Sequence, residues 1–284
     1  MKPSAHRRHL AALVWALLSV SPALAHDTWF EAKSQLQPGH QQPSQPQPSQ
    51  KQPSRLLMAL GTGNQFPVLE FPMDLRYLPL HGCQQDGRPL TLQGIAMAAK
   101  SLLLMTQPPA AGPVSCWAQS MPFELEMAAD KVAIYFDEIN PPQATRDRWA
   151  AMAARGLTWH ERYAKNARIE FAGAATDPVP TPAPQPSGMG LDVLMLSGLQ
   201  AVRSGDALVF QVLRDGQPLA DFAVELRGTA PGPGLWLRTD AQGTVRATAP
   251  APGRWLLRGT DLRIATDNPD RWDSRFITLA FDVK

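Results

Sequence analysis

The residue best placed to do chemistry is His26, which follows the small-residue segment Ala23-Leu24-Ala25. That segment is typical of a signal-peptidase cleavage site, so we expect His26 to begin the mature chain. Its free α-amine and its imidazole could then hold one metal ion in a six-membered ring. The α-amine titrates at about pH 8, so it can be freed for a metal at neutral pH. Nitrogen ligands of this kind favour copper or nickel.

Other ligands would have to complete such a site. His160 is the preferred second ligand, because the sequence places it in the first turn of a predicted helix, where the helix dipole favours the neutral imidazole. His81 is the next candidate, whereas His40 lies in a tract without fixed geometry. Asp27 could add an oxygen ligand. The alternatives are that His26 only happens to follow the cleavage site and that His160 is an ordinary half-buried residue.

The two cysteines, Cys83 and Cys116, offer a second kind of chemistry. In an oxidising compartment we expect them to form a disulfide. The bond would close a loop of about 30 residues and contribute about 3–4 kcal/mol in the chain-entropy model. The alternative is a thiolate metal site that uses His81-Gly82-Cys83.

The first 25 residues predict export. Lys2, Arg7 and Arg8 precede the apolar run Leu10–Val20, which is too short to cross a bilayer. Residues 1–25 are therefore predicted to be a cleaved signal peptide, and the protein to be periplasmic, with no membrane span in the mature chain. Without these residues the charge is close to neutral, which argues against nucleic-acid binding. P-loop, dinucleotide and metalloprotease motifs are absent from the sequence.

Composition divides the mature chain into two parts. We expect a β-rich domain over 26–172, interrupted at 33–54 by an insertion rich in Gln, Pro and Ser, which cannot bury a core. A Pro-rich linker is predicted over 173–188, although it could equally be a surface loop. A second domain is predicted over 189–284, where alternating apolar residues and regular turns indicate a β-sandwich.

Helical patterns are expected over about 130–168. Apolar residues at Val132, Tyr135, Phe136 and Ile139 have helical spacing. Thr145 is the expected cap of a second helix. Thr158 and Glu161 match a capping box, which predicts a third helix that contains His160. The predicted fold is mainly β, with two β-sandwich domains of immunoglobulin or transthyretin type and a short helical segment between them.

Several short segments, taken in order, resemble a known family. The chain resembles an exported bacterial domain family of unknown function, associated with nickel-uptake substrate-specific components, whose mature chains open His-x-x-Trp. The resemblance is carried by His26-Asp-Thr-Trp29-Phe30, Gly63-Asn-Gln-Phe66-Pro67, Asp130-Lys-Val-Ala-Ile-Tyr135, Glu161-Arg-Tyr-Ala-Lys165, Asp215-Gly-Gln-Pro-Leu219, Thr239-Asp-Ala-Gln-Gly243, Pro252-Gly-Arg-Trp-Leu-Leu-Arg258 and Trp272-Asp-Ser-Arg-Phe.

The resemblance implies a periplasmic two-domain β protein connected with nickel or cobalt. Relatives place a histidine soon after the Trp-Leu-Leu-Arg strand, where this chain has Thr260-Asp261; if that histidine is a ligand, this chain has either lost the ligand or uses Asp261 instead. The insertion after Glu31 is a second departure from the family pattern.

Three functions are compatible with these observations. The first is a non-catalytic metal-binding protein that uses His26 and either His160 or His81 and serves a membrane metal-uptake transporter. The second is a copper oxidase of the histidine-brace type that acts on polysaccharide. The third is a structural or carbohydrate-binding module that uses no metal.

Overall fold

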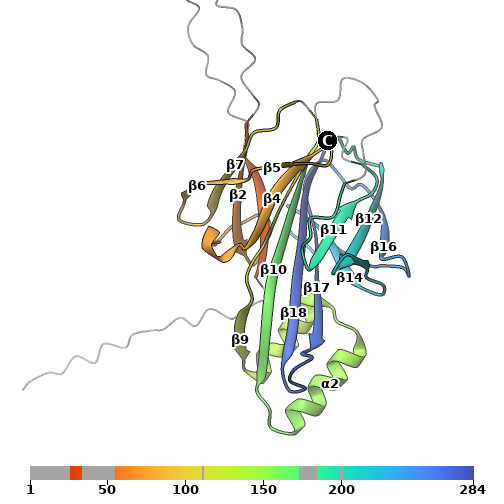
Figure 1. Cartoon of the computed structure of the whole chain (residues 1–284). Coiled ribbons are helices and arrows are strands. Elements are labelled where there is room, and N and C mark those ends of the chain that lie inside the picture. Colours follow the sequence, from red (N-terminus) through yellow and green to blue (C-terminus); the bar gives the residue numbers. More distant parts are fainter. Residues whose placement is uncertain (1–25, 34–54, 111, 173–183, 199–200) are drawn as a thin grey trace, which may run out of the picture.

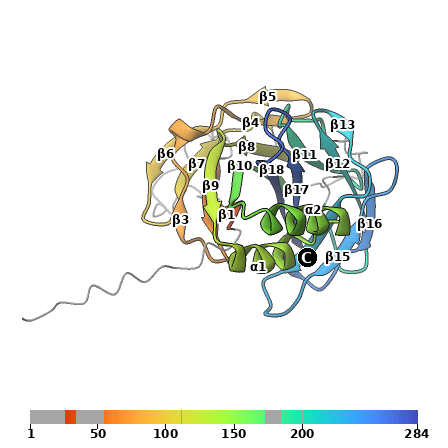
Figure 2. The same ribbon diagram turned by 90° about the horizontal axis from the view of Figure 1, so that it is seen from below.

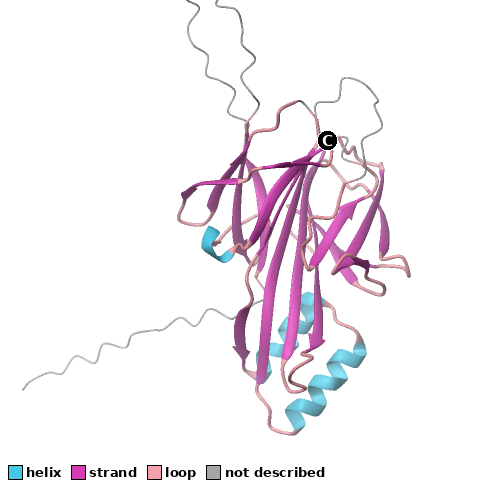
Figure 3. Ribbon diagram, viewed as in Figure 1, coloured by secondary structure: helices cyan, strands magenta, loops and turns pink. Residues whose placement is uncertain are grey.

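The computed structural model describes residues 26–33, 55–110, 112–172, 184–198 and 201–284. The predicted signal peptide, nearly all of the Gln/Pro/Ser-rich insertion with His40, and most of the Pro-rich linker lie outside these residues. The described chain is mainly β, as predicted (Figures 1 and 3). It contains no helix that is long and apolar enough to span a membrane.

A long central sheet forms the middle of the molecule (Figure 1). Its strands are, in spatial order, β15 (Leu235–Arg238), β14 (Ala223–Gly228), β17 (Gly253–Ile264), β18 (Trp272–Val283), β10 (Trp159–Phe171), β8 (Val114–Gln119), β4 (Leu80–Gln85) and β5 (Arg88–Leu90), with β9 (Phe123–Met127) paired to β10. β10 and β18 run parallel, and this pair joins the two halves of the sheet.

Two smaller sheets flank the central one. The first flanking sheet contains β1 (Asp27–Lys33), β2 (Leu56–Gly63), β7 (Leu102–Thr106), β6 (Gln93–Met97) and β3 (Phe71–Pro72), and a short helical turn, η1 (Leu75–Tyr77), follows β3. The second flanking sheet contains β11 (Leu191–Met195), β12 (Ala207–Arg214), β13 (Gln217–Pro218) and β16 (Thr244–Thr248).

Alternation along β18 places the flanking sheets on opposite faces of the central sheet. Ile277, Leu279 and Phe281 pack into the core beneath the second flanking sheet. Ala280 packs into the core beneath the first, and Thr278 donates a 2.6 Å hydrogen bond from its hydroxyl to the carbonyl of Thr28 in β1. Because successive side chains of a strand point to opposite faces, the central sheet forms one β-sandwich with the first flanking sheet and a second β-sandwich with the other.

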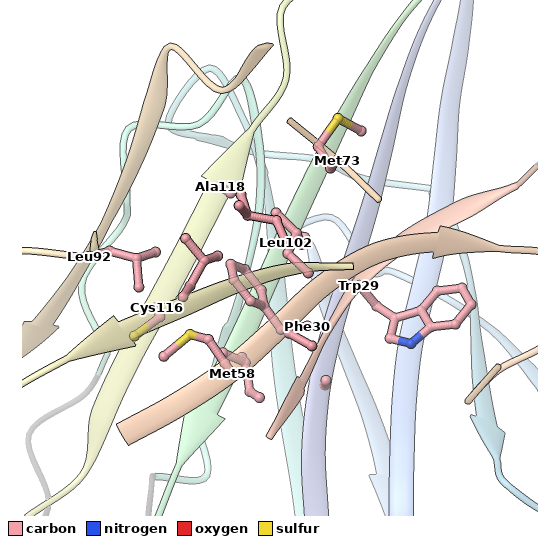
Figure 4. Packing of buried hydrophobic residues seen from close by; sticks show 14 of the residues in the cluster. Trp29, Phe30, Met58, Met73, Leu92, Leu102, Cys116 and Ala118 are labelled. Carbon is pink, nitrogen blue, oxygen red and sulfur yellow. The ribbon is translucent and has the colours of Figure 1, made fainter. Parts of the chain in front are cut away.

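The two sandwiches therefore share strands from both sides of the predicted linker. β10 lies before residues 173–188 and β18 lies after them, yet they are neighbours in one sheet. The core beneath the first flanking sheet draws residues from both halves, including Ile169 of β10 and Leu256 of β17. Figure 4 shows part of this core, with Phe30, Met58 and Cys116.

The two helices cover one end of the central sheet (Figures 1 and 2). Helix α1 (Ala129–Ile139) buries the four apolar residues whose spacing predicted it. The helix ends at Asn140, which has a left-handed backbone, and Pro141 follows. Helix α2 (Gln143–Ala154) begins after Pro142, so Thr145 lies inside the helix and the prediction that it is the cap is wrong.

The prediction of a third helix from Thr158 is also wrong, because residues 159–171 form β10. Trp159 and Glu161 are fully buried while His160 between them is exposed, which is the alternation of a strand. β10 pairs with β9, β8 and β18, and these partners outweigh the local capping pattern. His160 therefore does not lie at a helix N-terminus.

The expected disulfide between Cys83 and Cys116 is present, and it joins directly opposed residues of β4 and β8. Both residues are buried in the core beneath the first flanking sheet. Because both sulfur atoms are bonded to each other, the alternative thiolate site with His81 is not formed.

Candidate functional site

Strand β1 fixes the position of His26. Trp29 and Phe30 of this strand are each only 1% exposed. The Trp29 ring packs edge-to-face on the Phe66 ring, with 5.7 Å between the ring centroids. Asp27 lies opposite Gly63 of β2, where a Cβ atom would approach the Trp29 ring to 2.8 Å and the Val68 carbonyl oxygen to 2.2 Å. The close approach of β1 and β2 therefore depends on glycine at position 63.

The imidazole of His26 lies between Phe71 and Glu70. Its ring makes an edge contact with Phe71 at 5.6 Å, and its Nε2 lies 3.7 Å from Oε2 of Glu70. The backbone amide of Glu70 donates to the Thr62 carbonyl at 2.8 Å, and Oε2 accepts from the Asn64 amide at 3.2 Å. Glu70 is thus held beside His26 by the end of β2. Nothing in its local sequence singles it out.

Lys165 holds the backbone of His26 from the other side. Its Nζ donates a hydrogen bond to the His26 carbonyl and lies 3.5 Å from the centre of the Phe276 ring. Only 9% of Lys165 is exposed. The pKa of Lys165 is lowered to about 8, chiefly by burial; Asp27 and Glu161 oppose this shift, and Arg258 adds to it.

Asp27 does not face His26 as a ligand, because its carboxylate is paired with Arg258. The Nη1 of Arg258 lies 2.8 Å from Oδ2 of Asp27, and its Nε lies 2.6 Å from Oε2 of Glu225. The remaining Nη2 donates to the Glu138 carbonyl at 3.0 Å. Arg258 therefore ties β1, β14 and the end of α1 to β17.

Glu161 lies on the same face of β10 as Lys165 and is fully buried. Its carboxylate accepts hydrogen bonds from Tyr135 and Trp159, each at 2.9 Å, and from the Ser274 hydroxyl. Burial raises the pKa of Glu161, and the three hydrogen bonds oppose the shift.

A cavity of about 330 Å³ opens beside His26 and Lys165. Aromatic rings dominate its walls, and Thr62, His26 and Lys165 supply polar groups. The rings are those of Phe71, Phe123, Tyr135, Tyr163 and Phe276. This combination of an apolar lining with a few convergent polar groups is typical of small-molecule sites.

The structure does not bring the predicted histidines together. His160 lies half-exposed on β10, with Nδ1 3.3 Å from Oε1 of Glu126. Lys165 is five positions further along the same strand, which amounts to about 16 Å. Nδ1 of His81 lies 2.8 Å from the Leu78 carbonyl oxygen. Within the part of the chain that is described, no three His, Cys, Asp or Glu side chains gather into a metal-binding group.

The buried amine of Lys165 predicts a rise in stability at alkaline pH. The folded protein releases this proton at about pH 8 and the unfolded chain at about pH 10.5, so the unfolded state binds more protons between these values. The free energy of unfolding should therefore rise across this range, by up to about 3 kcal/mol relative to Lys165→Met. Urea unfolding of both proteins between pH 7 and 10.5 measures this difference. Parallel pH profiles would contradict the prediction.

Comparison with known proteins adds a family and a distant structural likeness. The pattern of a family described as Domain of unknown function (DUF4198) matches residues 23–260. None of the curated proteins compared with the chain matches it. Among solved structures, the D0-D1 domain of Intimin is similar at a TM-score of 0.18 and 13% sequence identity, over 80% of this chain and 89% of that one.

Proposed function

The chain belongs to the family described as Domain of unknown function (DUF4198), and from that premise we propose that it is an exported, non-catalytic protein that binds a transition-metal ion through His26. Removal of residues 1–25 would make His26 the first residue. The protein would then act in the periplasm and pass nickel or cobalt to a membrane uptake transporter.

The chelate would use the α-amine and Nδ1 of His26. These two atoms close a six-membered ring with one metal ion, and both must be unprotonated to bind it. Neutral imidazole and amine nitrogens suit nickel, cobalt and copper. The remaining coordination positions would be filled by water or by a small chelator that accompanies the ion.

The observation that carries the proposal is the position of Glu70, whose Oε2 lies 3.7 Å from Nε2 of His26. A metal-bound histidine almost always directs its other ring nitrogen to a carboxylate, a carbonyl or water, which fixes the ring orientation. With Nε2 turned to Glu70, Nδ1 is the nitrogen on the side of the α-amine. Lys165 supports this arrangement because it holds the His26 carbonyl.

The proposal assigns no role to the other predicted ligands. The Asp27 carboxylate is paired with Arg258. His160, on β10, faces Glu126 of the neighbouring strand β9. His81, on β4, contacts the Leu78 carbonyl, and β8 lies between β4 and β10. Glu70 replaces them as the side chain that supports His26.

Metal titration by calorimetry tests the proposal on protein whose N-terminus is His26. We expect one-to-one binding of Ni(II), Co(II) or Cu(II), lost in His26→Ala and in a form that carries one extra methionine before His26. Glu70→Gln should weaken binding by about tenfold to a hundredfold, because it replaces the carboxylate that orients the ring. His160→Ala is the matched control and should bind like the unmodified protein.

The opposite results would assign a different function. Binding that survives both the His26→Ala change and the added methionine would exclude the N-terminal chelate. A clear preference for copper together with reductant-dependent oxygen consumption would indicate a histidine-brace oxidase instead. Absence of metal binding would favour the structural or carbohydrate-binding module.

A further inference from the structure

The cavity beside His26 has the size and lining of a site for a small organic molecule. Its volume of about 330 Å³ lies at the lower end of the range for ligand sites, which is about 300–1,000 Å³. Met73, Leu125 and Met127 complete an otherwise aromatic wall. The ligand that fits such a wall has one apolar ring rather than several.

Three of the rings that line the cavity pack on one another and form a continuous aromatic wall. Phe123 and Tyr163 lie 5.6 Å apart, and Tyr163 meets Phe276 edge-to-face at 6.2 Å. Aromatic pairs prefer centroid separations of about 4.5–7 Å in tilted or edge-to-face arrangements. Phe71 stands at the cavity with 55% of its surface exposed, so this apolar ring remains available to a ligand.

Lys165 supplies a buried positive group in the same wall. An ammonium has three N–H donors, and Lys165 directs one to the His26 carbonyl while the face of Phe276 lies 3.5 Å from Nζ. The buried carboxylates of Asp27 and Glu161 are already engaged, because Asp27 is paired with Arg258 and Glu161 accepts three hydrogen bonds. A carboxylate on a ligand could accept a further N–H of Lys165.

We infer that this cavity binds a small aromatic carboxylate, with its ring among Phe71, Phe123 and Tyr163 and its carboxylate on Nζ of Lys165. The ring replaces water against apolar side chains. The carboxylate forms a charge-assisted hydrogen bond, which is roughly twice as strong as a neutral one. This site goes beyond the proposed metal function, because neither the α-amine nor a metal ion takes part.

Calorimetry with matched probes tests the inference. Phenylacetate, phenylacetamide and acetate are titrated into the protein in the presence of a chelator, which separates this site from any metal binding. We expect phenylacetate to bind at least about tenfold more tightly than phenylacetamide, because only the acid brings a negative charge to the ammonium of Lys165; tenfold corresponds to about 1.4 kcal/mol. Acetate, which lacks the ring, should not bind measurably.

Two substitutions assign the contacts. Lys165→Met should remove the preference for the acid over the amide. Phe71→Ala removes an exposed ring and should weaken both aromatic probes without unfolding the protein, whereas Ile95→Ala, a half-exposed residue outside the cavity lining, should leave binding unchanged. Equal affinity for acid and amide, or equal effects of Phe71→Ala and Ile95→Ala, would overturn the inference even if Lys165→Met failed to fold.

Discussion

Replacement of Arg258 by methionine is expected to lower the free energy of unfolding by about 3–5 kcal/mol, because it leaves charges buried without their partner. Arg258 contacts Asp27 at 2.8 Å and Glu225 at 2.6 Å, and it also donates to the Glu138 carbonyl. Asp27 and Glu225 are both buried in the folded protein. Methionine keeps much of the side-chain volume, so the decrease in the free energy of unfolding would come from the lost ion pairs rather than from a cavity. Equilibrium urea unfolding at pH 7 measures it.

Arg254 on the same strand provides the matched control. It pairs with Glu31, but 46% of its side chain is exposed, and exposed ion pairs contribute only about 0–1 kcal/mol. Arg254→Met should therefore have little effect on unfolding. Arg258→Lys keeps the charge but not the planar fork that reaches both carboxylates, so it should recover only part of the loss. Similar losses in Arg254→Met and Arg258→Met would contradict this account of the ion pairs.

Loss of the disulfide should have the second largest effect. The bond joins residues 33 positions apart, and the chain-entropy model assigns about 3–4 kcal/mol to a loop of this length. The double variant Cys83→Ala with Cys116→Ala should unfold at a correspondingly lower urea concentration. Alanine leaves no thiol in a core where both residues are buried.

Reduction separates the covalent bond from the side-chain change. A thiol reductant should destabilise the unmodified protein by nearly the same amount and leave the double variant unchanged. If the unmodified protein unfolds at the same urea concentration with and without reductant, the bond does not contribute as expected.

Local patterns predicted much of the fold. The four apolar residues at helical spacing predicted helix α1, which buries all of them. The Asp215-Gly216 pair lies in the region where regular turns were expected, and it has the left-handed backbone of a tight hairpin between β12 and β13. Such features are encoded within a few neighbouring residues, which is why sequence alone reveals them.

The errors arose where distant partners decide the structure. Thr158 and Glu161 match a helix cap, but this end of β10 pairs with β9 and β18 when it extends instead. β4 was not predicted, because its pairing depends on β8, more than thirty residues later. Local propensity is a weak guide when a strand is placed at the centre of a sheet.

The candidate site was predictable only in part. The sequence identified His26 from the cleavage pattern, but Glu70 reaches it through the pairing of β1 with β2 and β3. Lys165 falls within the predicted helical region 130–168, and only its place on strand β10 shows that it is buried beside His26. The aromatic cavity combines residues from seven separate segments, so no local spacing could reveal it.

The position of β18 also constrains the order of events during folding. Asn166 and Phe276, whose strands pair side by side, are 110 residues apart, and contacts at such separation slow folding because a long loop must close first. β18 is the last described strand, and it lies between β17 and β10. During synthesis from the N-terminus, the two halves of the central sheet therefore stay unjoined until β18, the last described strand, has left the ribosome.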